Sequence, residues 1–183
     1  MPVQIPTLHD GAGLRYVCRV TFAPLLTEPV RAVAFSPDGH TVATSSDDHT
    51  ARLGDTTDPH HPSPLATLTD HMDHVGSVAF TPDGRTLATA DDDYTARLWD
   101  ITDQHAPAVL ATLTGHGDSL TSAAFSPDGQ TLATASLDHS IRLWDTDAER
   151  VATRICTAAT PTITPAEWNQ HFPNLTYHPP CLP

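Results

Sequence analysis

The chain has 183 residues, a length that allows one domain of ordinary size or a part of a larger protein. Its 9 basic residues, all arginines, and 22 acidic residues give a net charge of −13. A field of this sign repels phosphate backbones and anionic lipid surfaces, so we expect neither nucleic-acid binding nor membrane binding.

The cysteines and the chain start indicate the compartment. Cys18, Cys156 and Cys181 lack the paired spacings of a zinc cluster or a disulfide scaffold. No apolar run approaches the roughly 18 residues of a spanning helix, and the first ten residues lack the layout of a signal peptide. We therefore expect a cytoplasmic protein in a reducing compartment. Cys156 and Cys181 can form a disulfide or a packed thiol pair, and this compartment favours packing.

One hexapeptide recurs three times at a fixed spacing. AFSPDG at 34–39 returns as AFTPDG at 79–84 and as AFSPDG at 124–129, so consecutive copies start 45 residues apart without insertion or deletion. Internal repeats of this length are typical of architectures in which each copy packs against its neighbours.

Each copy is expected to form four short strands joined by tight polar turns. In the second copy the apolar residues Val75, Val78 and Phe80 have the alternation of a half-buried strand. Residues 81–84 suit a type I turn, because proline presets the second position and glycine closes the fourth. The four expected strands of this copy are 65–68, 75–80, 86–90 and 95–99.

A Gly-His pair near the start of a copy and a Trp-Asp pair at its end complete the pattern. They are Gly115-His116, Trp99-Asp100 and Trp144-Asp145, with Asp70-His71 as a variant of the first pair. The pattern resembles WD40 repeats, the blades of a β-propeller. The resemblance implies an all-β fold, a partial propeller whose three blades form an open arc. The expected domains are an irregular segment 1–18, repeats over 19–145 (19–55, 64–100 and 109–145), and a tail 146–183.

The resemblance also implies a hydrogen-bond chain in each copy, from a histidine through a turn aspartate and a strand hydroxyl to the indole N–H of the tryptophan. In the third copy its members are His116, Asp138, Ser136 (less favoured, Thr134) and Trp144. In the second copy they are His71, Asp93 and Trp99, with Asp91 in place of the serine.

The first copy has lost part of this chain. It keeps Asp48 and Ser46, but Leu26 takes the place of the histidine and Gly54 that of the tryptophan. A buried aspartate without donors either reorients or costs about 1–3 kcal/mol. We therefore expect the first blade to be the loosest of the three.

The tail beyond Asp145 is expected to contain two short helices and a Pro-rich end. Residues 146–149 fit a capping box, and Thr164 with Pro165 fits a second helix start. The segments RIC at 154–156, ITPAEW at 163–168 and YHPPC at 177–181 resemble the C-terminal ending of large actinobacterial WD40 proteins. In that group the propeller commonly follows an NTPase or a protein-kinase module, but this sequence has no P-loop and no kinase glycine loop.

No catalytic, metal or cofactor site is expected. His71 and His74 in DHMDH, with His60 and His61 nearby, suggest a metal site, but His71 already has a structural role in the hydrogen-bond chain and His60-His61 lie in a Pro-rich loop. The run Asp91–Asp93 lacks the alternate spacing of a calcium loop. Cys18 has no paired His or Asn signature, and the sequence has no G-x-S-x-G motif.

With catalysis and metal binding disfavoured, protein binding is the expected function. The resemblance implies a rigid scaffold whose variable loops bind a partner. The candidate partner surface lies before the first strand of two blades, at Met72, Asp73, His74, Gly117, Asp118 and Ser119. The resemblance places the first strand of each repeat at the outer edge of the preceding blade. The third blade is therefore expected to lack an outer strand, and the expected strand at 20–23 has no preceding blade with which to pair. Three alternatives follow: head-to-tail assembly of copies, a truncated remnant with missing upstream blades, or a monomer whose tail caps the open edge.

Overall fold

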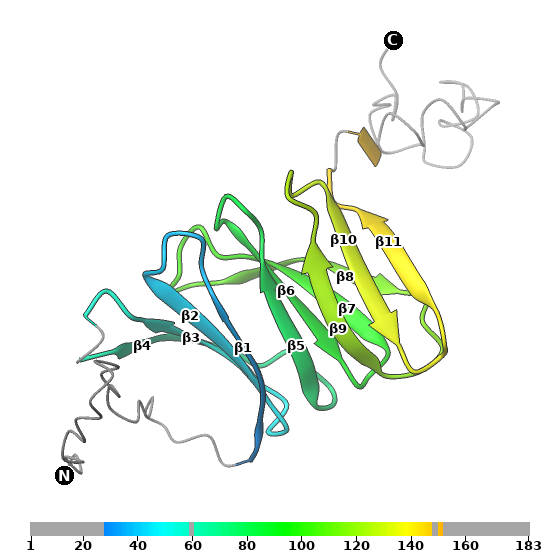
Figure 1. Ribbon diagram of the computed structural model, residues 1–183. Coiled ribbons are helices and arrows are strands. Elements are labelled where there is room, and N and C mark those ends of the chain that lie inside the picture. Colours follow the sequence, from blue (N-terminus) through cyan, green and yellow to red (C-terminus); the bar gives the residue numbers. More distant parts are fainter. Residues whose placement is uncertain (1–27, 59–60, 148–149, 152–183) are drawn as a thin grey trace, which may run out of the picture. The chain divides into compact units, whose positions relative to one another are not determined.

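The computed structural model describes residues 28–58, 61–147 and 150–151 (Figure 1). In this part of the chain eleven β-strands form three antiparallel sheets, so the all-β prediction is confirmed. The expected segment 1–18, the expected strand at 20–23 and the second expected tail helix lie outside the described residues. Across the described ranges, no helix is long and apolar enough to cross a membrane.

The three sheets follow one another along the chain. The first has the order β1-β2-β3-β4, with β1 Val30–Phe35, β2 Thr41–Ser46, β3 Ala51–Asp55 and β4 Ser63–Leu68. The second has the order β5-β6-β7-β8, with β5 Val75–Phe80, β6 Thr86–Asp91, β7 Thr95–Asp100 and β8 Ala108–Thr114. The third has the order β11-β10-β9, with β9 Leu120–Phe125, β10 Thr131–Ser136 and β11 Ile141–Asp145.

The outer strand of a sheet comes from the next copy of the repeat. β4 opens the second copy but pairs with β3 of the first, with Ala51 opposite Leu68. In the same way β8 opens the third copy and pairs with β7, with Thr95 opposite Thr114. The third sheet has three strands in the ranges that the structure describes. Consecutive copies are therefore interlocked through a shared sheet.

The turn between the first two strands of each sheet has the predicted form. In the first copy Gly39 N donates to Ser36 O over 2.9 Å, and Gly39 adopts a positive φ of 75°. The Ser36 hydroxyl donates to Asp38 Oδ1 over 2.6 Å and accepts from Thr41 N over 2.9 Å. The other two copies repeat this arrangement at 81–86 and 126–131. The turn sequence thus closes each hairpin by side-chain hydrogen bonds.

The sheets pack through their first strands. β5 contacts β1 and β2 on one side and β9 on the other, and β6 also contacts β9. Figure 1 shows β5 between the first and third sheets. Small alanines in β2 and β3 allow larger side chains of the second sheet to fill the interface. The buried core there consists of Ala43, Ala51, Leu53, Leu68, Val75, Val78, Leu87, Trp99 and Ile101.

The chain divides into two compact units, Met1–Leu143 and Trp144–Pro183. In the second unit the described residues contain the start of a helical turn. Asp147 Oδ1 accepts a hydrogen bond from Arg150 N over 3.0 Å, and Val151 N donates to Asp147 O over 2.9 Å. Asp147 therefore acts as the N-cap, one residue after the position that the capping-box pattern predicts. Arg150 also pairs with both carboxylate oxygens of Asp145 at 2.7 Å.

Candidate functional site

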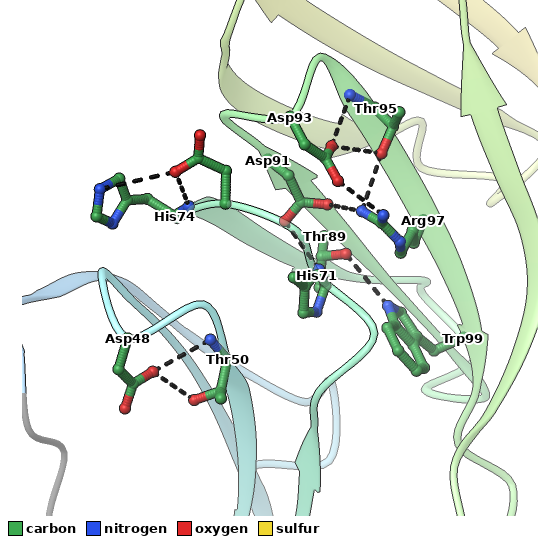
Figure 2. Close-up of polar contacts among 11 residues, drawn as sticks. Asp48, Thr50, His71, His74, Thr89, Asp91, Asp93, Thr95, Arg97 and Trp99 are labelled. Carbon is green, nitrogen blue, oxygen red and sulfur yellow. Dashed lines mark hydrogen bonds and ion pairs between the residues drawn. The ribbon is translucent and has the colours of Figure 1, made fainter.

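The second copy encloses a cluster of polar side chains (Figure 2). The Trp99 indole Nε1 donates to Thr89 Oγ1 over 3.2 Å, and both residues are buried. His71 Nδ1 lies 2.9 Å from Asp91 Oδ1, and both side chains are fully buried. No described residue hydrogen-bonds to His71 Nε2, so the hydrogen-bond chain from histidine to indole that the resemblance implies is interrupted in this copy.

Arg97 holds the two aspartates of this cluster together. Its Nη1 donates to Asp91 Oδ2 over 2.6 Å and its Nη2 to Asp93 Oδ2 over 2.7 Å. Asp93 also accepts from Thr95 N and Thr95 Oγ1, which fixes the turn between β6 and β7. Asp93 was the expected partner of His71, but the structure gives that place to Asp91. The carboxyl group of Asp91 extends further from β6 than the serine of the other copies and reaches the imidazole.

The two carboxyl groups differ in their proton affinity. Burial raises the pKa of Asp91 above its usual value, against the opposing effects of His71 and Arg97. Burial also acts to raise the pKa of Asp93, but hydrogen bonds from Arg97 and Thr95 outweigh it and lower that pKa. Arg97 is therefore the cation that allows two neighbouring carboxylates to be buried together.

The third copy contains the histidine-centred link. His116 Nδ1 donates to Asp138 Oδ2 over 2.8 Å, and in the tautomer that this bond requires His116 Nε2 accepts from Thr134 Oγ1 over 2.8 Å. Ser136, the expected hydroxyl, does not take this place, because it ends β10 where the register shifts and donates instead to Asp118 O over 2.9 Å. Trp144 lies in β11.

Asp138 organises the loop beside this link. Hydrogen bonds from the Ser140 hydroxyl and from Gly117 N lower the pKa of Asp138 well below its usual value. Gly117 N lies 2.9 Å from Asp138 Oδ2, and Ser140 Oγ lies 2.6 Å from Asp138 Oδ1. The carboxylate therefore joins the loop before β9 to the turn after β10.

The first copy lacks the link, and its unpartnered group differs from the expected one. Asp48 has donors, since it accepts from Thr50 Oγ1 over 2.5 Å and from Arg52 Nη2 over 2.8 Å. Thr44 Oγ1, which matches Thr89 and Thr134 by the repeat, is buried and has no hydrogen-bond partner among the described residues. The buried polar atoms of this copy that lack a described partner are thus Thr44 Oγ1, Ser45 Oγ, Arg52 Nε and Arg52 Nη1, rather than the carboxylate of Asp48.

We expect the same substitution to have opposite effects in two copies. Thr134→Val removes the hydroxyl that donates a hydrogen bond to His116 Nε2, so it should lower the free energy of unfolding by about 1–3 kcal/mol. Thr44→Val removes a buried hydroxyl that has no described partner, so the free energy of unfolding should stay the same or rise. Urea unfolding of both variants provides the comparison, and an equal loss in the two would show that the link carries no stability.

The loops of the candidate partner surface are anchored to the preceding copy. His74 Nδ1 donates to Asp47 O over 2.7 Å, and Ser119 Oγ donates to Asp92 O over 3.5 Å. Met72 is 81% exposed, and Gly117 is also exposed. Asp73 and Asp118 each accept the N–H of the following residue. The two loops therefore lie at the same end of their sheets, next to the Asp-rich turns of the preceding copies.

These features define a class of protein. Four-stranded sheets that follow a 45-residue repeat, with an outer strand from the next copy, are blades of a β-propeller. The sequence model of the family described as WD domain, G-beta repeat matches residues 17–55, 62–100 and 108–145. The chain therefore belongs to the WD40 family.

A solved structure has the same fold. The crystal structure of RRP9 WD40 repeats matches with a TM-score of 0.60 and 22% sequence identity, over 66% of this chain and 36% of that chain. The chain thus spans about a third of the length of this structural relative, and the likeness extends to the fold alone. No curated protein sequence matches the chain.

Proposed function

We propose that the chain is a non-catalytic scaffold that binds a protein or peptide partner at the end of its blades. The main support for the proposal is that loops at equivalent positions of two blades differ in sequence although the strands that follow them are alike. Residues 72–74 and 117–119 occupy equivalent positions before β5 and β9, yet their sequences are Met-Asp-His and Gly-Asp-Ser. Rigid sheets with variable loops are suited to recognition, because the binding groups are positioned before the partner arrives.

The charge of this end favours a basic partner. Asp73 and Asp118 lie in the two loops, and neither pairs with an arginine in the part of the chain that the structure describes. Asp92 lies in the turn that Ser119 contacts. The whole chain carries a net charge of −13, which strengthens the attraction for cations and repels anionic partners.

Fluorescence anisotropy with two labelled decapeptides, one Arg-rich and one Asp-rich, tests this proposal. The Arg-rich peptide should bind, and its affinity should fall when NaCl is raised to about 0.5 M because salt screens the charges. Asp73→Asn with Asp118→Asn should weaken binding about tenfold, the effect of about 1.4 kcal/mol. Asp58→Asn with Asp103→Asn removes two carboxylates from loops at the opposite end of the sheets and serves as the control. Equal binding by both double variants would contradict the proposed surface.

We further propose that the chain corresponds to the C-terminal part of a bacterial signalling or regulatory protein in the cytoplasm. The support is the resemblance of residues 154–156, 163–168 and 177–181 to the ending of large actinobacterial WD40 proteins. The 36% coverage of the RRP9 repeats is compatible with missing blades. Reading frames for further blades upstream of Met1 would support this origin.

Self-association is a second candidate function, and two exposed apolar faces favour it. Val33 on β1 is 64% exposed, whereas the equivalent Val78 on β5 is 6% exposed because it packs on the first sheet. Leu143 on β11 is 72% exposed, whereas the equivalent Leu53 on β3 is 1% exposed. Val33 and Leu143 thus occupy positions whose equivalents, Val78 and Leu53, belong to one core between two sheets. The face around Val33 of one copy could pack in the same way on the face around Leu143 of another copy, which is a head-to-tail contact.

A further inference from the structure

We propose that His49, Asp73 and His74 bind a divalent transition-metal ion such as Zn²⁺ where the first and second sheets meet. One ligand atom of each residue lies within 4.8 Å of the others. His49 lies in the turn between β2 and β3, and Asp73 and His74 precede β5. The ion would therefore connect two blades.

The orientation of His74 fits a metal ligand. Its Nδ1 donates to Asp47 O over 2.7 Å, which leaves Nε2 as the nitrogen with a free lone pair. This Nε2 lies 3.7 Å from Asp73 Oδ1. The His49 ring meets the His74 ring edge-on, with centroids 5.0 Å apart. A backbone carbonyl that holds the second ring nitrogen is the common support of histidine ligands, because it fixes the tautomer and the ring direction.

The structure groups the histidines differently from the sequence. Figure 2 shows His71 turned towards Asp91 and His74 turned away from it, so the two histidines of DHMDH do not share a site. His74 instead meets His49, which belongs to the preceding copy. The metal site that the sequence disfavoured joined His71 with His74, whereas the present one joins His74 with His49 and leaves the contact of His71 with Asp91 unchanged.

The donor set selects the class of ion. Two imidazole nitrogens and one carboxylate oxygen suit Zn²⁺, Ni²⁺ or Cu²⁺, with water in the remaining coordination position. Ca²⁺ and Mg²⁺ require more oxygen ligands and bind imidazole poorly. Binding an ion would require side-chain rotations from the present 4.8 Å spacing, and these side chains have room to rotate, since His49 is exposed and Asp73 and His74 are 47% and 40% exposed.

The next junction in the chain provides an internal comparison. By the repeat, Tyr94, Asp118 and Ser119 occupy the places of His49, Asp73 and His74. Ser119 Oγ donates to Asp92 O there, as His74 Nδ1 does to Asp47 O. Tyr94 and His49 share a positive φ, 70° and 64°. The same backbone therefore forms with tyrosine and serine, so the fold of the junction does not depend on the two imidazoles of His49 and His74.

The test replaces the two imidazoles with the residues of the next junction, His49→Tyr with His74→Ser. After dialysis against a chelator, calorimetric titration with ZnCl₂ at pH 7.5 should show one saturable ion per wild-type chain and a melting temperature that rises with zinc. The double variant should lose at least 100-fold in affinity, and Asp73→Asn about tenfold, while both melt cooperatively without metal. His139→Tyr makes the same change at the equivalent turn of the third copy and should bind zinc as the wild type does.

Two results would overturn the proposal. One is a wild-type chain that takes up no zinc at a saturable site. The other is equal zinc affinity in the wild type and in the His49→Tyr, His74→Ser variant, which would place the binding at other histidines of the chain. A titration with CaCl₂ should show no saturable binding, and tight calcium binding would contradict the assigned donor set.

Discussion

Replacing Arg97 by methionine is expected to lower the free energy of unfolding by about 3–5 kcal/mol at pH 7, because it leaves buried carboxylates without their cation. Arg97 is itself buried and holds Asp91 at 2.6 Å and Asp93 at 2.7 Å. Methionine retains most of the apolar stem, so the loss measures the charge rather than the packing. Urea unfolding followed by tryptophan fluorescence measures the difference.

The pH dependence of this variant has a definite sign. Without Arg97, the pKa of Asp91 rises further because one effect that opposes burial is removed, and Asp93 loses the Arg97 contacts that lower its pKa but keeps those of Thr95. Above the ordinary aspartate pKa of about 4, the folded variant then binds more protons than its unfolded state, so its stability falls as the pH rises through the raised pKa. The deficit relative to the wild type should therefore shrink as the pH is lowered from 7 to 5.

Two further variants distinguish the loss of buried charge pairing from a general effect of replacing an arginine. Arg142 occupies the equivalent position of the third copy and is exposed, so Arg142→Met should change the free energy of unfolding by less than about 0.5 kcal/mol. Adding Asp91→Ser to Arg97→Met removes one of the two carboxylates and should restore part of the lost stability. A deficit that persists unchanged at pH 5 would contradict the electrostatic explanation.

Light scattering on a sizing column is expected to show a concentration-dependent mass that approaches about 39 kDa, twice the 19.6 kDa of the chain. The reason is the pair of exposed faces around Val33 and Leu143, whose counterparts Val78 and Leu53 pack together inside the chain. Burial of such apolar surface contributes roughly 25 cal/mol per Å². A charge placed on either face should therefore prevent association.

Single substitutions test the contact. Val33→Asp and Leu143→Asp should each give a monomer of 19.6 kDa at all concentrations. Met72→Asp introduces the same charge at an exposed loop residue outside both faces and should leave the mass unchanged. A wild-type monomer at every concentration would argue against self-association, and polydisperse aggregates would favour a fragment that lacks its neighbouring blades.

The repeat predicted the fold because its signals are local. The alternation of Val75, Val78 and Phe80 and the turn at 81–84 depend on residues close in sequence, and both are present in the structure. The register of three equal copies then fixed which strands pair, including the outer strand from the next copy. Local pattern and repetition together determine this architecture.

The polar contacts were harder to predict than the strands, because they depend on the length and direction of individual side chains. Thr134 and Ser136 both offer a hydroxyl near the end of β10, and the sequence does not show that Thr134 meets His116 while Ser136 donates to Asp118 O. Asp91 rather than Asp93 lies beside His71, and Arg97 binds both aspartates, a set of contacts that the spacing of the sequence does not reveal. The approach of His49 to His74 was missed, since it depends on how two copies pack.

The exchange of outer strands makes the chain unequally sensitive to nicking. A peptide-bond cut between β7 and β8 would leave both pieces joined by the ladder in which Thr95 pairs with Thr114 and Asp100 with Ala108. Among the described residues, a cut between β8 and β9 would leave the pieces without a shared strand ladder, in contact through the packed faces of the second and third sheets. A cut between β7 and β8 should therefore weaken the folded chain less than a cut between β8 and β9, because the boundary of a sheet and the boundary of a sequence repeat fall at different loops.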